Sequence, residues 1–165
     1  MTTHFNSSII YKFFKQKNMK LKIANKSKNE MPTYANPGDA GFDLRANLEN
    51  PVTIKPGEWK LIPTGLFMKI PDGMEGQIRS RSGMSLKKGL TVLNSPGTID
   101  SSYIGHVQVI LINQSQEEQV VEHGERIAQM VFAKHEVAEI EVVSSEEQLG
   151  KTERGTGGFG STGSH

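Results

Sequence analysis

The C-terminal stretch 154–163, with the sequence R-G-T-G-G-F-G-S-T-G, contains the residue types that bind a nucleotide. The guanidinium of Arg154 suits a phosphate, and the ring of Phe159 can stack on a flat heterocycle. Further donors for phosphate oxygens come from hydroxyl and backbone N–H groups, at Gly160, Ser161 and Thr162. The stretch is either a lid that orders over a polyphosphate or a disordered tail, because glycine loses much entropy on ordering.

A second anion-binding pattern is the segment R-S-R-S-G at 79–83. On a strand, two arginines one residue apart point the same way. The strand would run into a short helix at 82–88, with Ser82 as its N-cap and Gly89 as its stop. Because a helix N-terminus exposes N–H groups, the segment predicts a phosphate cradle of Arg81, Ser82 and Gly83. The alternative is a solvated basic corner.

The segment N-S-P-G-T-I-D-S-S-Y at 94–103 combines turn residues with three chemically useful side chains. The amide of Asn94 could read a base edge with a paired donor and acceptor. Asp100 could hold a water molecule, and Tyr103 could lie flat against a sugar. The alternative is a plain turn with a capping aspartate.

Two further segments each contain one polar residue. Asp43 lies within the apolar run A-G-F-D-L, where a carboxylate is costly unless it is paired or capping a turn. Gln129 is the spare polar group of G-E-R-I-A-Q-M, which follows a turn. Neither segment alone identifies a function.

Short β-type runs separated by Gly, Pro, Asn and Asp dominate the chain, which predicts an all-β protein with one short helix. Strands of this length and spacing are typical of a jelly-roll-like barrel or sandwich. The predicted strands are 21–24, 52–54, 60–62, 66–70, 76–80, 107–113, 119–122, 126–133 and 137–143.

Three regions are expected along the chain. Residues 1–18 are basic and predict a disordered extension, with Met19 as a candidate natural start; 19–143 form the β domain, and 144–165 a flexible C-terminal arm. The run 107–112 is so apolar that it predicts a strand buried on both faces. In a small β protein a subunit interface can provide such burial, so we expect a homo-oligomer.

The composition argues against several classes of function. A net charge of +1 gives no basic surface for nucleic acid, and no apolar run reaches the roughly 20 residues of a membrane span. The chain has no cysteine, which fits a reducing, cytoplasmic compartment. Neither an H-E-x-x-H zinc signature nor a G-x-x-x-x-G-K-[ST] loop is present. Any metal would therefore be Mg²⁺ carried by substrate phosphates.

Taken in order, the five segments resemble the five motifs of the trimeric dUTP pyrophosphatases (dUTPases), over residues 20–163. The resemblance implies a β jelly roll in a homotrimer whose active sites lie between subunits. One subunit would supply the base pocket, a neighbour phosphate contacts, and the third its arm. It also implies Mg²⁺-dependent hydrolysis of dUTP to dUMP and pyrophosphate, which keeps uracil out of DNA and supplies dUMP for thymidylate synthesis.

The resemblance also implies roles for individual residues. Asp100 would be the general base, and Tyr103 would pack under deoxyribose and exclude a 2′-hydroxyl. Arg154 would grip the γ-phosphate while Phe159 stacks on uracil, and Asp43 would support the water and metal network. Uracil would be read by Asn94, by the backbone of Gly97, Thr98, Ile99 and Asp100, and by the backbone of Gln108. Other phosphate contacts would come from Arg81, Ser82, Gly83, Gln129, Gly160, Ser161 and Thr162.

The chain departs from the family pattern at three positions. Ser80 stands where many relatives have proline, and Tyr-Ile-Gly-His at 103–106 replaces Tyr-Arg-Gly-Glu. Two rival functions are a dCTP deaminase of the same fold and a non-catalytic nucleotide-binding trimer. The deaminase needs a glutamate at the base, whereas segment 94–103 offers Asp100. The non-catalytic trimer would be expected to lack Asp100 or the arm.

Overall fold

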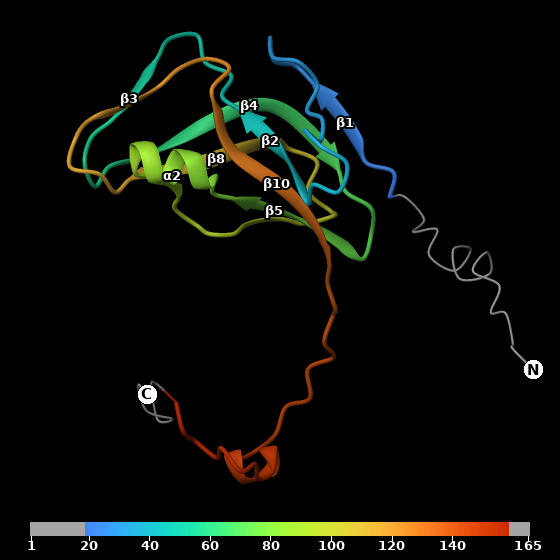
Figure 1. Cartoon of the computed structure of the whole chain (residues 1–165). Coiled ribbons are helices and arrows are strands. Elements are labelled where there is room, and N and C mark those ends of the chain that lie inside the picture. The colour runs from blue at the N-terminus through green and yellow to red at the C-terminus, as the bar shows by residue number, and fades with distance from the viewer. Residues whose placement is uncertain (1–18, 159–165) are drawn as a thin grey trace, which may run out of the picture. The chain divides into compact units, whose positions relative to one another are not determined.

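The computed structural model describes residues 19–158 of the chain. These residues belong to two compact units, which divide between His135 and Glu136. The first unit contains all the strands of the described part (Figure 1). The second has one short 3-10 helix, η1 (Glu146–Leu149).

Two four-stranded antiparallel sheets and one two-stranded ribbon build the first unit (Figure 1). The first sheet has the order β1 (Lys22–Asn25), β4 (Trp59–Lys69), β8 (His106–Asn113) and β6 (Leu90–Val92). The second has the order β2 (Gly41–Arg45), β10 (Arg126–Lys134), β5 (Met74–Arg79) and β7 (Gly97–Ile99). The ribbon pairs β3 (Val52–Ile54) with β9 (Gln119–Val121), and α2 (Ser82–Lys88) links β5 to β6.

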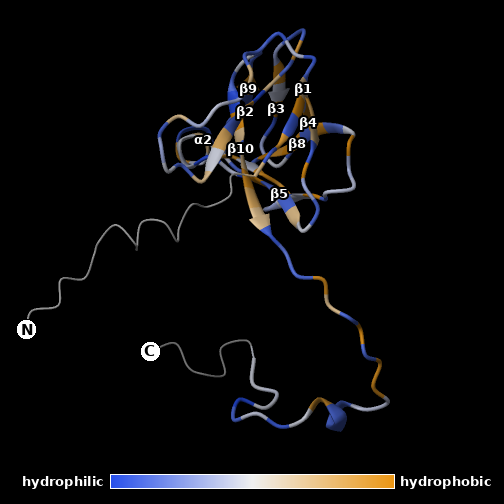
Figure 2. Cartoon of the chain, turned by 90° about the vertical axis from the view of Figure 1, so that its right-hand side faces the viewer, coloured by the Kyte–Doolittle hydropathy of each residue, from blue (hydrophilic) through white to orange (hydrophobic). Residues whose placement is uncertain are grey.

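Side chains from both four-stranded sheets form one buried cluster. Val109 and Leu111 of β8 are fully buried in it together with Leu44 of β2 and Met130 of β10. Hydrophobic residues accordingly colour much of β10 in Figure 2, while many of the connecting segments are hydrophilic. The predicted all-β, jelly-roll-like fold is therefore confirmed.

The predicted elements agree with the structure in part. The strand at 52–54 and the helix at 82–88 have the predicted bounds, but Arg81 rather than Ser82 is the N-cap, because the backbone is still extended there. The strands predicted at 60–62 and 66–70 are one strand, β4. The strand predicted at 137–143 is wrong, since these residues pair with no strand of the described chain and are exposed. Three strands, β2, β6 and β7, were not among the predicted ranges.

β8 is not buried on both faces within one chain. Val107, Val109 and Leu111 are fully buried. The side chains that alternate with them are only half-buried, namely His106, Gln108, Ile110 and Ile112. The alternation shows one face in the core and one face open to a neighbouring hollow. The expected homo-oligomer thus stays a prediction.

A bulge interrupts the pairing of β4 with β8. Pro63 faces Gln108 and Leu66 faces Val107, so Thr64 and Gly65 are extra residues on β4. The buried Thr64 hydroxyl donates to the Val107 carbonyl oxygen at 2.6 Å. Gly65 has a φ of 74°, a conformation that favours glycine. The bulge therefore keeps its hydrogen bonds although the ladder is broken.

The same Asn-Xaa-Ser turn follows β1 and β8. In each turn the asparagine Oδ1 accepts hydrogen bonds from the serine N–H and hydroxyl, at 2.9 and 2.7 Å. The asparagine side-chain N–H donates to the carbonyl oxygen of the residue four positions later. The backbone N–H of the residue that follows the asparagine donates to the carbonyl oxygen of a glycine with positive φ. The turn at Asn25 and Ser27 holds Gly65, and the turn at Asn113 and Ser115 holds Gly89.

The two turns differ in burial, which gives a prediction. Asn113→Ala removes a fully buried amide that also donates to Ile54, so it should lower the free energy of unfolding by about 3 kcal/mol. Asn25→Ala changes the same local bonds in a half-exposed turn and should cost about 1 kcal/mol. Urea denaturation of both variants at one protein concentration measures the difference. Equal losses would show that burial of the amide is unimportant.

Candidate active site

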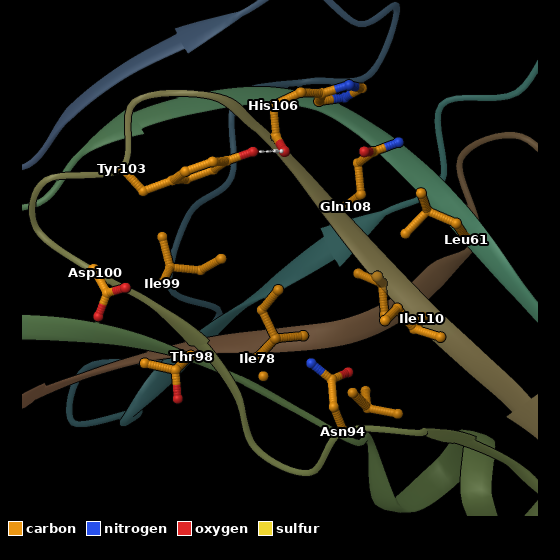
Figure 3. A pocket seen from close by; sticks show the side chains of 13 residues that line it. Leu61, Ile78, Asn94, Thr98, Ile99, Asp100, Tyr103, His106, Gln108 and Ile110 are labelled. Carbon is orange, nitrogen blue, oxygen red and sulfur yellow. Dashed lines mark hydrogen bonds between the residues drawn. The ribbon is translucent and has the colours of Figure 1, made fainter.

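A hollow lies between β5, β7 and β8, over the open face of β8 (Figure 3). Apolar side chains line much of it, contributed by Leu61, Ile78, Ile99 and Ile110. Polar groups also line it, from Asn94, Thr98, Asp100, Tyr103 and Gln108. An apolar pocket with a few convergent polar groups is the usual form of a small-molecule site.

Asn94 and Gly97 sit on one side of this hollow. The Asn94 amide points into it in Figure 3, and Gly97 begins β7 against Ile78 of β5. A side chain at Gly97 would lie 3.2 Å from Asn94 Nδ2 and 3.3 Å from Ile78 Cβ. Glycine therefore lets the backbone of β7 lie close to both the Asn94 amide and Ile78.

The backbone of Gln108 faces the same hollow. Pairing with β6 covers only Leu111–Asn113 of β8, and the Leu93 N–H then donates to the Ile110 carbonyl oxygen at 2.9 Å. Strand N–H and C=O groups alternate in direction with period two, so those of Gln108 point past the end of β6. Gln108 thus presents a donor and an acceptor side by side.

Asp100 and Tyr103 lie at opposite ends of one turn at the rim. The Tyr103 N–H donates to the Asp100 carbonyl oxygen at 3.1 Å, and both side chains are exposed. The Tyr103 hydroxyl donates to the His106 carbonyl oxygen at 3.0 Å (Figure 3). The turn thereby sets a carboxylate and a flat ring at one edge of the hollow.

Arg81 lies in a network of charges outside this hollow. Its Nε donates to Asp43 Oδ1 at 2.6 Å, and Arg126 Nη1 donates to Asp43 Oδ2 at 3.2 Å. Gln129 lies opposite Asp43 on β10, and its amide donates to the Ser80 carbonyl oxygen at 3.0 Å. Three of the residues that the motifs predicted, Asp43, Arg81 and Gln129, are thus brought together around the start of α2. The water and metal role predicted for Asp43 stays a prediction, and the structure gives its carboxylate two guanidinium partners.

The two predicted groups of residues line different hollows of the described chain. Arg81 and Gly83 line a second hollow whose cations also include Arg45, Lys87 and Arg126. Ser82 is exposed on the first turn of α2. Asn94, Asp100 and Tyr103 are among the residues of the first hollow only. Within one described chain, the residues predicted to read the base and those predicted to bind phosphate are therefore separate.

Sequence reasoning missed two supporting residues. Ser80, one of the departures, accepts the Val92 N–H at 2.9 Å through its hydroxyl and so ties β5 to the end of β6. Lys69 donates from Nζ to the Ser101 carbonyl oxygen at 2.7 Å and holds the turn of Asp100 and Tyr103. Neither contact has a signal in the sequence, because each joins residues that only the fold brings together.

The C-terminal candidates fall outside this arrangement. Arg154 belongs to the second unit, where its Nε donates to the Gly157 carbonyl oxygen at 2.7 Å. Phe159, Gly160, Ser161 and Thr162 lie outside the described residues. The predicted arm therefore remains a prediction.

Comparison with known proteins identifies the family of this chain. The profile of the dUTPase family matches residues 27–163. The chain belongs to the dUTPase family. It is 52% identical over 134 residues to a deoxyuridine 5′-triphosphate nucleotidohydrolase of Neorickettsia sennetsu, covering 81% of this chain and 88% of that one. Membership confirms the family resemblance and makes the chain a hydrolase.

Solved structures show the same fold. The dUTPase of Staphylococcus bacteriophage 80alpha with dUPNHPP is 30% identical with a TM-score of 0.73, covering 87% of this chain and 98% of that one. A dUTPase mutant from phage phi11 of S. aureus, described with a structural Mg(II) ion, is 24% identical with a TM-score of 0.69. That match covers 78% of this chain and 99% of the phage chain, and it supports the fold alone.

Two absences apply to residues 19–158. None of the helices described there has the length and apolar character to cross a membrane. The same residues contain no group of three or more His, Asp or Glu side chains placed to hold a metal ion.

Proposed function

We propose that this chain hydrolyses dUTP to dUMP and pyrophosphate, with uracil and deoxyribose bound in the hollow between β5, β7 and β8. The observation that carries the proposal is the set of groups converging there: the Asn94 amide, the Gln108 backbone, the Tyr103 ring and the Asp100 carboxylate. Such a hydrolase keeps uracil out of DNA and supplies dUMP for thymidylate synthesis.

Uracil recognition follows from donor and acceptor pairing. The uracil edge presents carbonyl oxygens on either side of one N–H, so it needs a donor and an acceptor in alternation. The Asn94 side chain and the Gln108 backbone each offer both kinds of group, and the backbone of 97–100 offers more. Cytosine reverses part of this pattern, and a buried site rejects a base that leaves its polar groups unpaired.

The reaction needs a water molecule activated next to the α-phosphate. Asp100 accepts a proton from water while the water oxygen bonds to the α-phosphorus. The bond from that phosphorus to its bridging oxygen then breaks, and pyrophosphate leaves. Asp100 suits this role because its exposed carboxylate has no hydrogen-bond partner among residues 19–158, so its oxygens are open to water and substrate.

Charge on the phosphates must be offset by cations. Arg81, Ser82, Gly83 and Gln129 form the proposed phosphate contacts, with Arg154 on the γ-phosphate. Bound Mg²⁺ would gather the phosphate oxygens and offset their charge. Because Asp43 already has two guanidinium partners, the residues described fit a metal that the substrate carries rather than one in a protein cage.

The separation of the two sets of residues favours a site shared between subunits. A base in the first hollow of one chain needs phosphate contacts that the same hollow does not supply. In a homotrimer a neighbour's Arg81 set would meet the triphosphate. The third subunit's arm, residues 144–165, would then close over it with Phe159 on uracil and Gly160, Ser161 and Thr162 on phosphates.

Pyrophosphate release measured with dUTP, dCTP, dTTP and UTP tests the function. At low substrate concentration we expect pyrophosphate to be released from dUTP alone. Ammonia from dCTP would support the deaminase, and binding without any release would support the non-catalytic trimer. Either result would overturn the proposal.

Asp100→Asn tests the general base. The amide keeps the shape but accepts no proton, so kcat should fall by about 10²–10⁴-fold while dUTP still binds. Steady-state turnover and calorimetric binding measure the two quantities. Asp39→Asn, which alters a carboxylate that accepts the Asn36 N–H on an exposed loop, is the matched control and should leave turnover unchanged. A near-normal kcat in Asp100→Asn would remove the assignment.

Asp43→Asn tests whether the carboxylate positions Arg81. Loss of the charge frees the guanidinium, so KM for dUTP should rise about fivefold. Glu58→Gln disrupts an ion pair of equal length, 2.6 Å to Lys60, and should leave KM unchanged. If Asp43→Asn binds dUTP as well as the unmodified chain, the ion pair does not position Arg81.

Deletion of residues 153–165 tests the arm. The strands lie before this segment, so the fold and the trimer should persist, as sedimentation would show. Loss of the Arg154 contact should reduce kcat/KM about tenfold or more. The double variant Arg154→Ala, Phe159→Ala at full length separates loss of these side chains from loss of length. Normal turnover after truncation would exclude a lid.

A further inference from the structure

Backbone atoms of the residues that follow Tyr103 help to hold its side chain in place. Its hydroxyl donates to the His106 carbonyl oxygen, and its ring lies against Gly105. A side chain at Gly105 would come within 2.5–2.9 Å of the Tyr103 Oη, Cζ and Cε2 atoms. Tyr103 is 44% exposed and lies at the rim of the hollow. The position of the ring thus depends on the backbone at 105–106.

The His106 side chain fixes that backbone. Its imidazole points away from Tyr103, as Figure 3 shows, and its Nε2 accepts the Gly65 N–H at 2.8 Å. The imidazole also stacks on Phe67, with centroids 5.1 Å apart and planes at 18°. His106 and Phe67 form the first pair of the β4–β8 ladder, so the contact ties the start of β8 to the bulge.

Residues that follow β1 hold the bulge in place from its other side. Ser27 packs on Gly65, where an added Cβ would lie 2.5 Å from the Ser27 Cβ, and the Lys26 N–H bonds the Gly65 carbonyl oxygen at 2.8 Å. The Lys26 ammonium also lies 5.1 Å from the centroid of the Phe67 ring. The turn after β1 therefore holds Gly65 in place independently of its bond to His106.

We infer that His106 is a positioning residue for sugar discrimination: its imidazole anchors the carbonyl oxygen that holds Tyr103 against the 2′ position of the substrate. Relatives with glutamate at this position lack the ring that stacks on Phe67. The inference rests on the proposed function, since Tyr103 must first face deoxyribose. Acceptance of a backbone N–H requires Nε2 to be unprotonated, so the imidazole proton is on Nδ1.

Two substitutions separate the hydrogen bond from the stacking. His106→Phe keeps an aromatic ring beside Phe67 but has no acceptor, whereas His106→Gln keeps an acceptor at about the reach of Nε2 and loses the ring. We measure the ratio of kcat/KM for dUTP to that for UTP. The Phe variant should lose about fivefold in this ratio, through KM rather than kcat, and the Gln variant should retain it.

His123→Phe is the matched control. His123 Nδ1 also accepts a backbone N–H, from Leu48 at 3.2 Å, but this imidazole lies at a turn that does not line the hollow. The control removes a similar bond and should leave the ratio unchanged. An unchanged ratio in His106→Phe, or an equal loss in His106→Gln, would overturn the inference.

A measurement without catalysis keeps the two proposals distinguishable. In the unmodified chain labelled with ¹⁵N, NMR should show a coupling between the Gly65 nitrogen and His106 Nε2 through the hydrogen bond, with the ring proton on Nδ1. A proton on Nε2 would overturn the role of His106 even if dUTP is hydrolysed. Suppose instead that the bond is present and that His106→Phe loses selectivity in the binding of non-hydrolysable dUTP and UTP analogues. If the unmodified chain then releases no pyrophosphate from dUTP, only the proposed reaction fails.

Discussion

The bulge at Thr64 and Gly65 sets how β4 lies against β8, and the geometry of the hollow depends on that register. Two extra residues on β4 leave backbone groups that the ladder cannot pair, and an unpaired buried group is costly. The Thr64 hydroxyl and the His106 imidazole pair them instead. Because side chains alternate along β8, a slip of one residue would turn Gln108 and Ile110 into the core.

The same register leaves part of the β8 backbone unpaired beside the hollow, where we propose that the base binds. β6 pairs with only the last three residues of β8, and the chain then leaves the sheet through Leu93 toward Asn94. The Ser80 hydroxyl holds the end of β6 at that point. The gap left beside Gln108 has a donor and an acceptor at fixed spacing, which a flexible side chain could provide only at an entropic cost.

The sequence could predict the local parts of this arrangement but not its long-range contacts. The turn residues around Gly97 and the helix at 82–88 were predictable, since turn and stop chemistry is local. The Asp43–Arg81 and Gly65–His106 contacts join residues 38 and 41 positions apart. The strand predicted at 137–143 failed for the opposite reason: its apolar alternation is local, and in the described chain no neighbouring strand pairs with it.

The separation of Asp100 from Arg81 in different hollows has a consequence for how such a hydrolase would be controlled. A chain with the base pocket but without phosphate contacts in the same hollow can bind a nucleoside weakly and has little means to offset triphosphate charge. Catalysis would then require assembly, and no single chain could attack triphosphates on its own. In the proposed shared site Asp43 would contribute to this control, because its ion pair with Arg81 would present a pre-arranged cation to a neighbour.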